Sequence, residues 1–300
     1  MSINEPFVSI VVTTRNEESN IENCLLSIQE QSYKNVEIIV VDNKSTDRTK
    51  ELASHFTDLV FNKGPERSAQ RNYGMIDVAK GEYVMFVDAD MILAPKLVEA
   101  CIRTIQAGGF SALHIPEIIL GSKYFSRVRR FERSFYDGTV VDGARFFKKD
   151  VFVKVGGFDP SMSGPEDWDI DKKIKHEGRI GLLQKNLVDL SGWSLWRFIE
   201  DRGIHESWSD VIFHNETEFS LKRYLAKKAY YSASFDAYIT KWGKDDPDLK
   251  KQFGLWYRYF GIFLENNKWK RMFRRLDLAF GMYFLRFLVG VVYLVKGRVD

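Results

Sequence analysis

The sequence has little cysteine and no large excess of charge of either sign. Cys24 and Cys101 are the only two thiols among 300 residues. Both fall on apolar positions of predicted helices, so we expect buried, reduced thiols in a reducing cytosol. The formal net charge of +3 is too small to indicate nucleic-acid binding. Residues 1–6 are mostly polar, so we expect no signal peptide and a cytoplasmic location.

A glycine-rich phosphate loop is also lacking. Residues 7–12 (FVSIVV) predict a first buried strand, and the polar loop 13–17 (TTRNE) follows it. A dinucleotide-binding Rossmann unit would carry Gly-x-Gly-x-x-Gly at this place. That mode of binding is therefore excluded, and side chains must contact any nucleotide.

The stretch 81–90 (GEYVMFVDAD) is the most informative part of the chain. Residues 83–87 are β-branched, aromatic or otherwise apolar, which suits a strand buried on both faces. Asp88 and Asp90 follow at its end, where open α/β sheets bind ligands. Such oxygen ligands suit Mg²⁺ or Mn²⁺ that carries a diphosphate. The alternative is a solvated turn.

Strands alternate with helices along the first half of the chain. This order predicts a doubly wound, mostly parallel α/β sheet of Rossmann-like type. We expect a catalytic domain over residues 1–219 and a helical C-terminal extension over 220–300. The predicted strands cover residues 7–12, 36–41, 59–61, 83–87, 112–116, 145–147 and 211–214.

Three further residues are candidate contacts for a nucleotide: Asp42 at the end of a predicted strand, and Arg67 and Arg71 on a predicted helix. Asp42 ends the second predicted strand, where its carboxylate could accept from a base or a ribose hydroxyl; alternatively it caps the next helix. Arg67 and Arg71 lie one helical turn apart and could clamp phosphate or stack on a base. The alternative for both arginines is a solvated helix face.

An acidic cluster follows Gly164 and Pro165. We expect Glu166 and Asp167 on the loop side, where a catalytic base would stand, whereas the later acids of the cluster serve the helix N-terminus. His214 ends another predicted strand. It is either structural or a further ligand for a metal at Asp90.

Taken together, these segments resemble the family 2 glycosyltransferases of the GT-A fold. The resemblance covers residues 7–215, about two-thirds of the chain. The matching motifs are Thr14-x-Asn16-Glu17, Asp42-Asn43-x-Ser45-Thr46-Asp47, Ala69-x-Arg71-Asn72, Asp88-Ala89-Asp90, Gly156-Gly157-Phe158-Asp159 and Glu166-Asp167-Trp168-Asp169.

The resemblance implies a nucleotide-sugar donor, a UDP-sugar ahead of a GDP-sugar, and a divalent cation, Mn²⁺ or Mg²⁺. It implies transfer to a glycan or lipid-linked acceptor hydroxyl with inversion. Because the Gln-x-x-Arg-Trp signature of processive synthases is absent, we expect transfer of a single sugar. The implied nucleotide-sugar contacts are Thr14, Arg15, Glu17, Asp42, Arg71 and Asp88; the metal ligands are Asp90, Asp88 and His214; and Asp167 is the base, supported by Glu166.

Two rival functions share this fold plan. A sugar nucleotidyltransferase would carry a Gly-rich, Arg-containing first loop, which is absent here. A non-catalytic nucleotide-binding scaffold would have lost its acidic pairs, yet both pairs are present.

The C-terminal extension ends in a basic segment, 268–275 (KWKRMFRR), and an apolar run, 278–295. Arg286 lies inside that run, which is costly for a spanning helix. Three alternatives are a helix in the membrane interface, packing on the catalytic domain or a second subunit, and a true span. The first predicts peripheral contact through 268–297 with the cytoplasmic face of the membrane, and a polyprenyl-linked acceptor.

Overall fold

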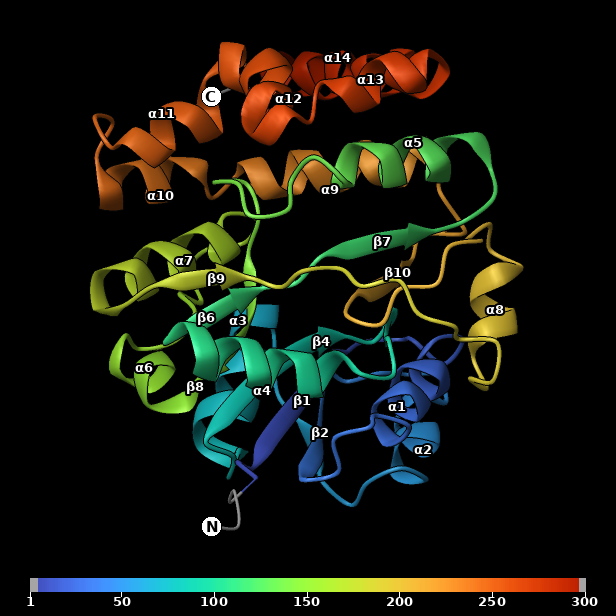
Figure 1. Cartoon of the computed structure of the whole chain (residues 1–300). Coiled ribbons are helices and arrows are strands. Elements are labelled where there is room, and N and C mark those ends of the chain that lie inside the picture. Colours follow the sequence, from blue (N-terminus) through green and yellow to red (C-terminus); the bar gives the residue numbers. More distant parts are fainter. Residues whose placement is uncertain (1–4, 297–300) are drawn as a thin grey trace.

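The computed structural model of the chain describes residues 5–296 (Figure 1). Residues 1–4 and 297–300 lie outside the described part. They include most of the polar stretch 1–6 and the last residue of the segment 268–297.

A seven-stranded sheet forms the centre of the molecule, in the order β3-β2-β1-β4-β8-β6-β9. The first four strands are mutually parallel, as the alternating pattern predicts, whereas β8 is antiparallel to β4 and to β6. The strands are β1 Val8–Thr14, β2 Val36–Asp42, β3 Val60–Asn62, β4 Tyr83–Asp88, β6 Ala112–His114, β8 Ala144–Lys148 and β9 Ile180–Leu182.

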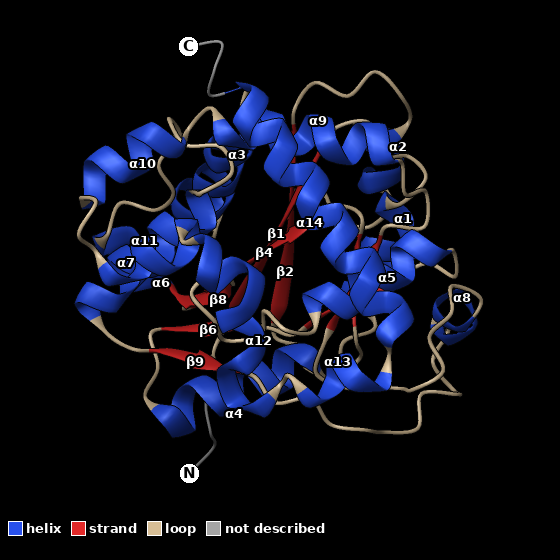
Figure 2. Cartoon of the chain, turned by 90° about the horizontal axis from the view of Figure 1, so that it is seen from above, coloured by secondary structure: helices blue, strands red, loops and turns tan. Residues whose placement is uncertain are grey.

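Helices cover both faces of this sheet (Figures 1 and 2). Residues Val8, Ile10 and Val12 of β1 pack on one side with α1 and α4, and Val11 packs on the other with η1, α6 and α7. Both faces are buried, which is why β1, β2 and β4 are largely apolar. These helices are α1 Ile21–Gln29, α2 Thr49–Ser54, α3 Arg67–Asn72, η1 Tyr73–Val78, α4 Leu97–Gly108, α6 Lys149–Lys154 and α7 Glu166–Glu177.

The two cysteines lie in this core. Cys24 of α1 and Cys101 of α4 are free and buried, which confirms that prediction.

A three-stranded sheet, β5-β10-β7, lies beyond the ends of the parallel strands. Its strands are β5 Met91–Leu93, β7 Glu117–Leu120 and β10 Ile212–Asn215; the short helix α8 (Trp196–Glu200) packs beside them. β10 is antiparallel to β5 and parallel to β7. This pairing carries His214 to the neighbourhood of Asp90 and Glu117, although these residues are far apart in the sequence.

The remaining helices form a layer across the top of the view in Figure 1, in which α5 and α9 lie above β7 and β10, and α10 and α11 lie above α7. Its core joins α5 to the C-terminal helices through Val128, Phe135, Phe263, Met282 and Leu285. The helices are α5 Tyr124–Arg133, α9 Leu221–Ser232, α10 Phe235–Trp242, α11 Pro247–Phe253, η2 Tyr257–Gly261, α12 Ile262–Leu264, η3 Glu265–Asn267, α13 Lys270–Arg274 and α14 Leu276–Lys296.

Candidate active site

A cavity of about 390 Å³ lies where β1 and β4 end, between these strands and α9. This is the edge of the sheet at which the sequence predicts a ligand site. Seven of the eleven residues singled out from the sequence line it: Thr14, Arg15, Glu17, Arg67, Asp88, Asp90 and His214. The other four, Asp42, Arg71, Glu166 and Asp167, lie behind or beside its wall.

The loop after β1 is shaped by Asn16. Its φ of 54° is left-handed, a conformation that Asn tolerates better than most residues. The Asn16 backbone N–H donates to Ser45 Oγ at 2.8 Å, and Asn16 Oδ1 accepts from the Thr46 backbone N–H at 2.8 Å. The loops after β1 and β2 are therefore joined, which holds Thr14 and Glu17 at the cavity.

Asp42 is fully buried and turned toward its own loop. Its carboxylate accepts hydrogen bonds from both the backbone N–H and the hydroxyl of Ser45. It does not line the cavity. The structure thus gives Asp42 a loop-ordering contact, and its predicted contact with a nucleotide base stays a prediction.

Arg71 links the two acidic motifs. Its Nη2 lies 3.1 Å from Asp88 Oδ1, and its Nη1 lies 3.1 Å from Asp167 Oδ1. The guanidinium is buried and stands 3.9 Å from the centroid of the Phe86 ring. Burial alone would raise the pKa of Asp88, but Arg71, with Arg145, outweighs it and holds that pKa well below its usual range. Asp88 is therefore ionised at neutral pH.

From the sequence we expect Glu166 and Asp167 on the loop before the helix. This prediction is wrong, because α7 begins at Glu166. Pro165 precedes them, and acids at a helix N-terminus are stabilised by the helix dipole. The two carboxylates differ in access. Glu166 is buried and pairs with Arg67 at 3.0 Å, whereas the Asp167 side chain is 33% exposed. Burial, together with the Asp167 charge, raises the pKa of Glu166.

His214 bridges two carboxylates. Its Nδ1 lies 2.6 Å from Glu117 Oε1, and its Nε2 lies 3.1 Å from Asp90 Oδ2. Burial alone would lower the pKa of His214, but Asp90 and Glu117 outweigh it and raise that pKa well above its usual value. The two carboxylates therefore favour the imidazole with a proton on each ring nitrogen.

The site offers a cation two unpartnered oxygens. Asp90 Oδ1 and Thr14 Oγ1 are buried, and neither has a hydrogen-bond partner among the described residues. Burial, and then the nearby negative charges of Asp90 and Asp88, raise the pKa of Glu17. Within residues 5–296, no three His, Cys, Asp or Glu side chains are arranged to hold a metal ion. The residues fit a cation that takes part of its ligands from a bound diphosphate.

Helix α9 contributes to the site, which the sequence did not predict. Lys227, Tyr230 and Tyr231 line the cavity, although they belong to the segment 220–300 predicted as an extension. Arg67 Nη2 donates to Tyr231 Oη at 3.0 Å. The concentration of Tyr and Lys in this segment is the only sequence signal for this role. The predicted boundary at 219/220 stays a prediction, but residues after it contribute to the site.

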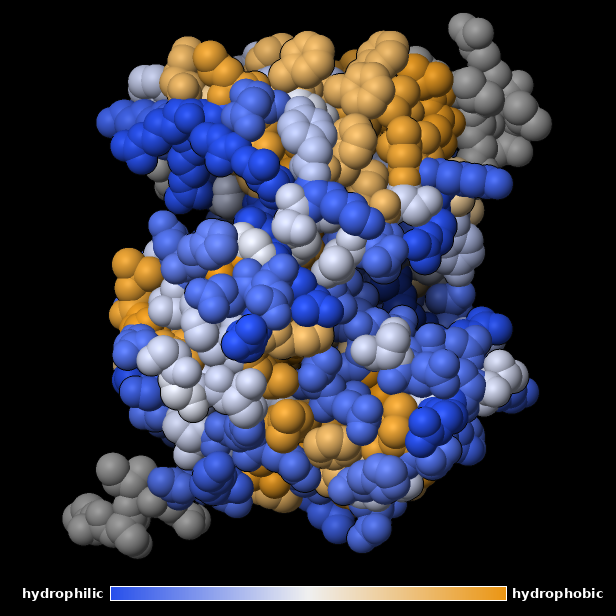
Figure 3. Space-filling model, turned by 90° about the vertical axis from the view of Figure 1, so that its right-hand side faces the viewer, coloured by the Kyte–Doolittle hydropathy of each residue, from blue (hydrophilic) through white to orange (hydrophobic). Residues whose placement is uncertain are grey.

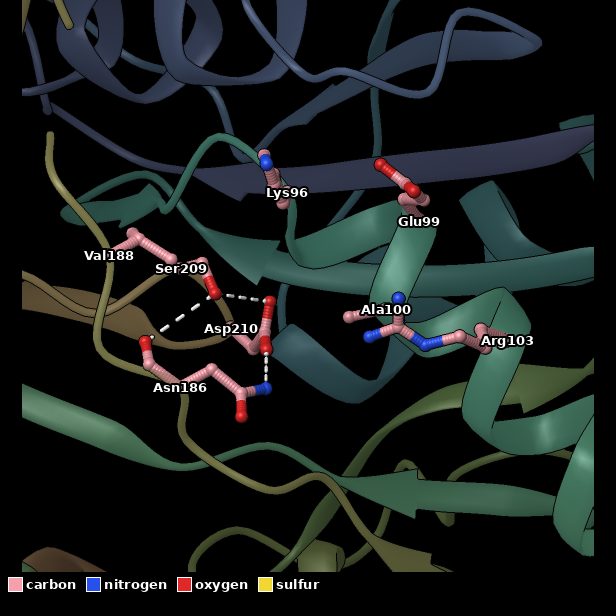
Figure 4. Close-up of a pocket in the computed structure, with 8 residues that line it drawn as sticks. All are labelled: Lys96, Glu99, Ala100, Arg103, Asn186, Val188, Ser209 and Asp210. Atoms are coloured by element: carbon pink, nitrogen blue, oxygen red, sulfur yellow. Dashed lines mark hydrogen bonds between the residues drawn. The ribbon is translucent and has the colours of Figure 1, made fainter.

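A second hollow of about 210 Å³ lies between α4 and the loops before β10 (Figure 4). Asp210 in its wall already accepts from Ser209 Oγ at 2.8 Å and from the Asn186 side chain. None of the residues predicted for the site lines it, and we assign it no role.

Two comparisons by sequence establish the family. The model of the glycosyl transferase family 2 matches residues 9–158. Glycosyltransferase GlyG of Streptococcus pneumoniae serotype 4 is 32% identical over 226 residues, which are 72% of this chain and 70% of GlyG. The chain belongs to glycosyltransferase family 2.

Other curated relatives in this family match over shorter stretches. Three of them match over only 30%, 41% and 20% of their own length. GalNAc(5)-diNAcBac-PP-undecaprenol beta-1,3-glucosyltransferase of Campylobacter jejuni is 35% identical over 95 residues, 28% of this chain and 30% of that enzyme.

Solved structures share the fold of this family 2 chain. The mannosyltransferase PcManGT of Pyrobaculum calidifontis, in complex with GDP-Man and Mn²⁺, has a TM-score of 0.59 at 19% identity, over 99% of this chain and 87% of that one. S. aureus TarS in complex with UDP-GlcNAc has a TM-score of 0.50 at 15% identity, over 92% and 79%. The predicted GT-A α/β fold is confirmed.

Proposed function

We propose that this chain transfers a single sugar from a nucleotide-sugar donor to an acceptor hydroxyl, with inversion at the anomeric carbon. The observation that carries the proposal is the convergence of Asp88, Asp90 and Asp167 with Arg67 and Arg71 around one cavity at the sheet edge. Carboxylates for a metal and a proton, beside arginines for a diphosphate, are what this reaction needs.

We propose that the donor is a nucleoside diphosphate sugar that binds in the cavity. PcManGT is described with GDP-Man and TarS with UDP-GlcNAc, which supports this class of donor. Our prediction for this chain remains a UDP-sugar ahead of a GDP-sugar. Thr14, Arg15 and Glu17 would contact the nucleotide, with Arg67 and Lys227 facing its phosphates.

A divalent cation, Mn²⁺ or Mg²⁺, would be held by Asp90 through its unpartnered Oδ1, with Asp88 nearby. His214 could join them only after it loses the proton on Nε2, which now faces Asp90 Oδ2. When bound, such a cation neutralises charge that develops on the departing diphosphate.

The chain's own residues supply the remaining steps. Arg67 and Lys227 attract the diphosphate into the cavity, and α9 covers it. Arg71 fixes Asp167 and Asp88 relative to each other through two ion pairs of 3.1 Å. Asp167, which is more accessible than Glu166, takes the proton from the acceptor hydroxyl as that oxygen attacks the anomeric carbon from the face opposite the leaving group.

We expect the acceptor to be a glycan or a polyprenyl-linked sugar, and the sugar to be transferred to it at the cytoplasmic face of the membrane. The Campylobacter jejuni relative, whose printed name gives an undecaprenol-linked acceptor, supports this class.

The variant Asp167→Asn tests the role of the base. Nucleotide binding should persist, because Asp167 is not one of the proposed nucleotide contacts, whereas transfer should fall by about 10²–10⁴-fold. Asp150→Asn, an exposed acid at the start of α6, is the matched control and should transfer normally. Near-normal transfer by Asp167→Asn would remove Asp167 from this role.

A further inference from the structure

Large apolar side chains are exposed in one region of the chain. Eleven of the fifteen exposed large hydrophobic residues in the described chain fall between residues 255 and 291. We call them the C-terminal apolar surface: Leu255, Trp256, Phe260, Leu264, Trp269, Phe273, Leu276, Phe280, Phe284, Phe287 and Val291. Figure 3 shows hydrophobic colour gathered at the end of the molecule where Figure 1 places α12, α13 and α14. Patches of this kind mark interaction sites.

Helix α14 is apolar on two opposite faces. Leu278, Met282 and Leu285 are buried against the rest of the protein, mainly against α5 and α9. The exposed large apolar residues of α14 recur every three or four positions, so they form a single stripe on the other face. They are Leu276, Phe280, Phe284, Phe287 and Val291.

α14 is long and apolar enough to cross a membrane, over Leu276–Tyr293. However, Arg286 fixes it to α5. The Arg286 side chain is buried, with Nε 3.0 Å from Glu132 Oε1 and Nη2 2.8 Å from Tyr136 Oη. A spanning position would break these contacts and carry the guanidinium into hydrocarbon. In the packed arrangement, only the exposed stripe of α14 is available to contact a membrane.

The charge around this surface is strongly positive. Residues 255–291 contain seven Lys or Arg and two acids. Two of these cations, Lys268 and Arg286, are buried, whereas Lys270, Arg271, Arg274 and Arg275 are exposed. Lys270 and Arg274 are exposed and have no carboxylate partner within the described residues. A second copy of this surface would bring like charges together and offers few acids to pair with them. Anionic lipid headgroups complement it.

We propose that the C-terminal apolar surface docks the protein on an anionic lipid monolayer, with its Phe, Leu and Trp side chains below the headgroups and its cations among them. Membrane contact is thus monotopic, through the outer face of α14 and its neighbours. Because α9 contacts α14 and also lines the cavity, docking sets the active site near the lipid surface. A lipid-linked acceptor would then reach the site; this last clause rests on the proposed function.

Flotation of the full chain with vesicles tests the docking. We expect binding to phosphatidylcholine vesicles with about one-third phosphatidylglycerol, and weaker binding without the anionic lipid. The triple variant Phe280→Ser, Phe284→Ser and Phe287→Ser should bind more than about tenfold more weakly. The matched control Val153→Ser with Leu187→Ser, exposed apolar residues outside the surface, should bind like the wild type.

Quenching of tryptophan fluorescence by brominated lipids tests the docking independently and needs only conservative substitutions. The lipids should quench this fluorescence, and the quenching should fall when Trp256 and Trp269 are replaced by Phe. The docking would be overturned if the wild type bound neither kind of vesicle, or if the triple variant floated with vesicles as well as the wild type does. A dimer that the triple variant abolishes, in protein that binds no vesicles, would show that a second copy covers the surface.

Nucleotide-induced thermal shifts keep the two proposals apart. The triple variant should retain them, since none of its residues lines the cavity. Vesicle binding without any nucleotide binding would overturn the proposed function alone.

Discussion

Replacing Arg71 by Met removes the guanidinium that joins Asp88 to Asp167 while keeping an apolar side chain beside Phe86. Each charge-assisted hydrogen bond contributes about 1.5–3 kcal/mol. The Asp88 and Asp167 side chains are 24% and 33% exposed, so water can partly replace the arginine and the lower figure applies to each. We therefore expect the free energy of unfolding to fall by about 3 kcal/mol.

Chemical denaturation at several pH values is the assay. Because Arg71 helps to depress the pKa of Asp88 in the folded state, the stabilisation is present above the unfolded-state pKa, about 3.9, and is lost as the pH falls through the lower folded-state pKa. The difference between wild type and Arg71→Met should therefore be full at pH 7 and shrink below about pH 4.

Arg48→Met is the matched control. Arg48 also forms an ion pair within a helical segment, with Glu51, but both side chains are exposed, so its loss should change stability little. The reasoning is refuted if Arg71→Met is as stable as the wild type at pH 7, or if its deficit is the same at low pH.

Three further predictions concern buried groups outside the cavity. Burial alone would lower the pKa of His114, but Asp171 and Asp142 raise it, so His114→Gln should lose more stability at pH 6 than at pH 9, and an equal loss would contradict this. Arg286→Met should cost about 1.5–3 kcal/mol by removing the charge-assisted hydrogen bond to buried Glu132, which keeps its ion pair with Arg129 at 2.7 Å. The change of Glu132 to Gln should then cost less in that variant than in the wild type, and additive losses in denaturation would refute the coupling of the pair. Burial raises the pKa of both cysteines, so neither thiol should react with Ellman's reagent before unfolding, and rapid labelling of native protein would contradict this.

Much of the fold could be predicted because its signals are local. The apolar runs of β1, β2 and β4 are continuous, and each ends in a polar residue that marks the sheet edge. Asp88 and Asp90 could therefore be placed at the cavity from one short stretch of sequence. The β-strand that carries His214 was predicted within one residue, since its apolar residues are also contiguous.

The contacts that define the site could not be predicted in the same way. Glu117 meets His214 only because β7 and β10 pair across the smaller sheet, a pairing that no local pattern specifies. Lys227 and Tyr231 reach the cavity because α9 packs over it, which depends on tertiary contacts of the whole helical layer. Asp42, conversely, ends a strand as expected but turns into its own loop, because Ser45 lies within hydrogen-bond reach.

The central claim is a metal-assisted nucleotide-sugar site at Asp90, and a thermal-shift experiment tests it most directly. Wild type and Asp90→Ala would be melted with UDP or GDP, in Mn²⁺, in Mg²⁺ or in EDTA. A ligand that binds only the folded state must raise the melting temperature. We predict that one nucleotide stabilises the wild type only with the metal, and that Asp90→Ala loses this stabilisation. An equal shift in EDTA and in Asp90→Ala, or no shift with either nucleotide, would contradict the account.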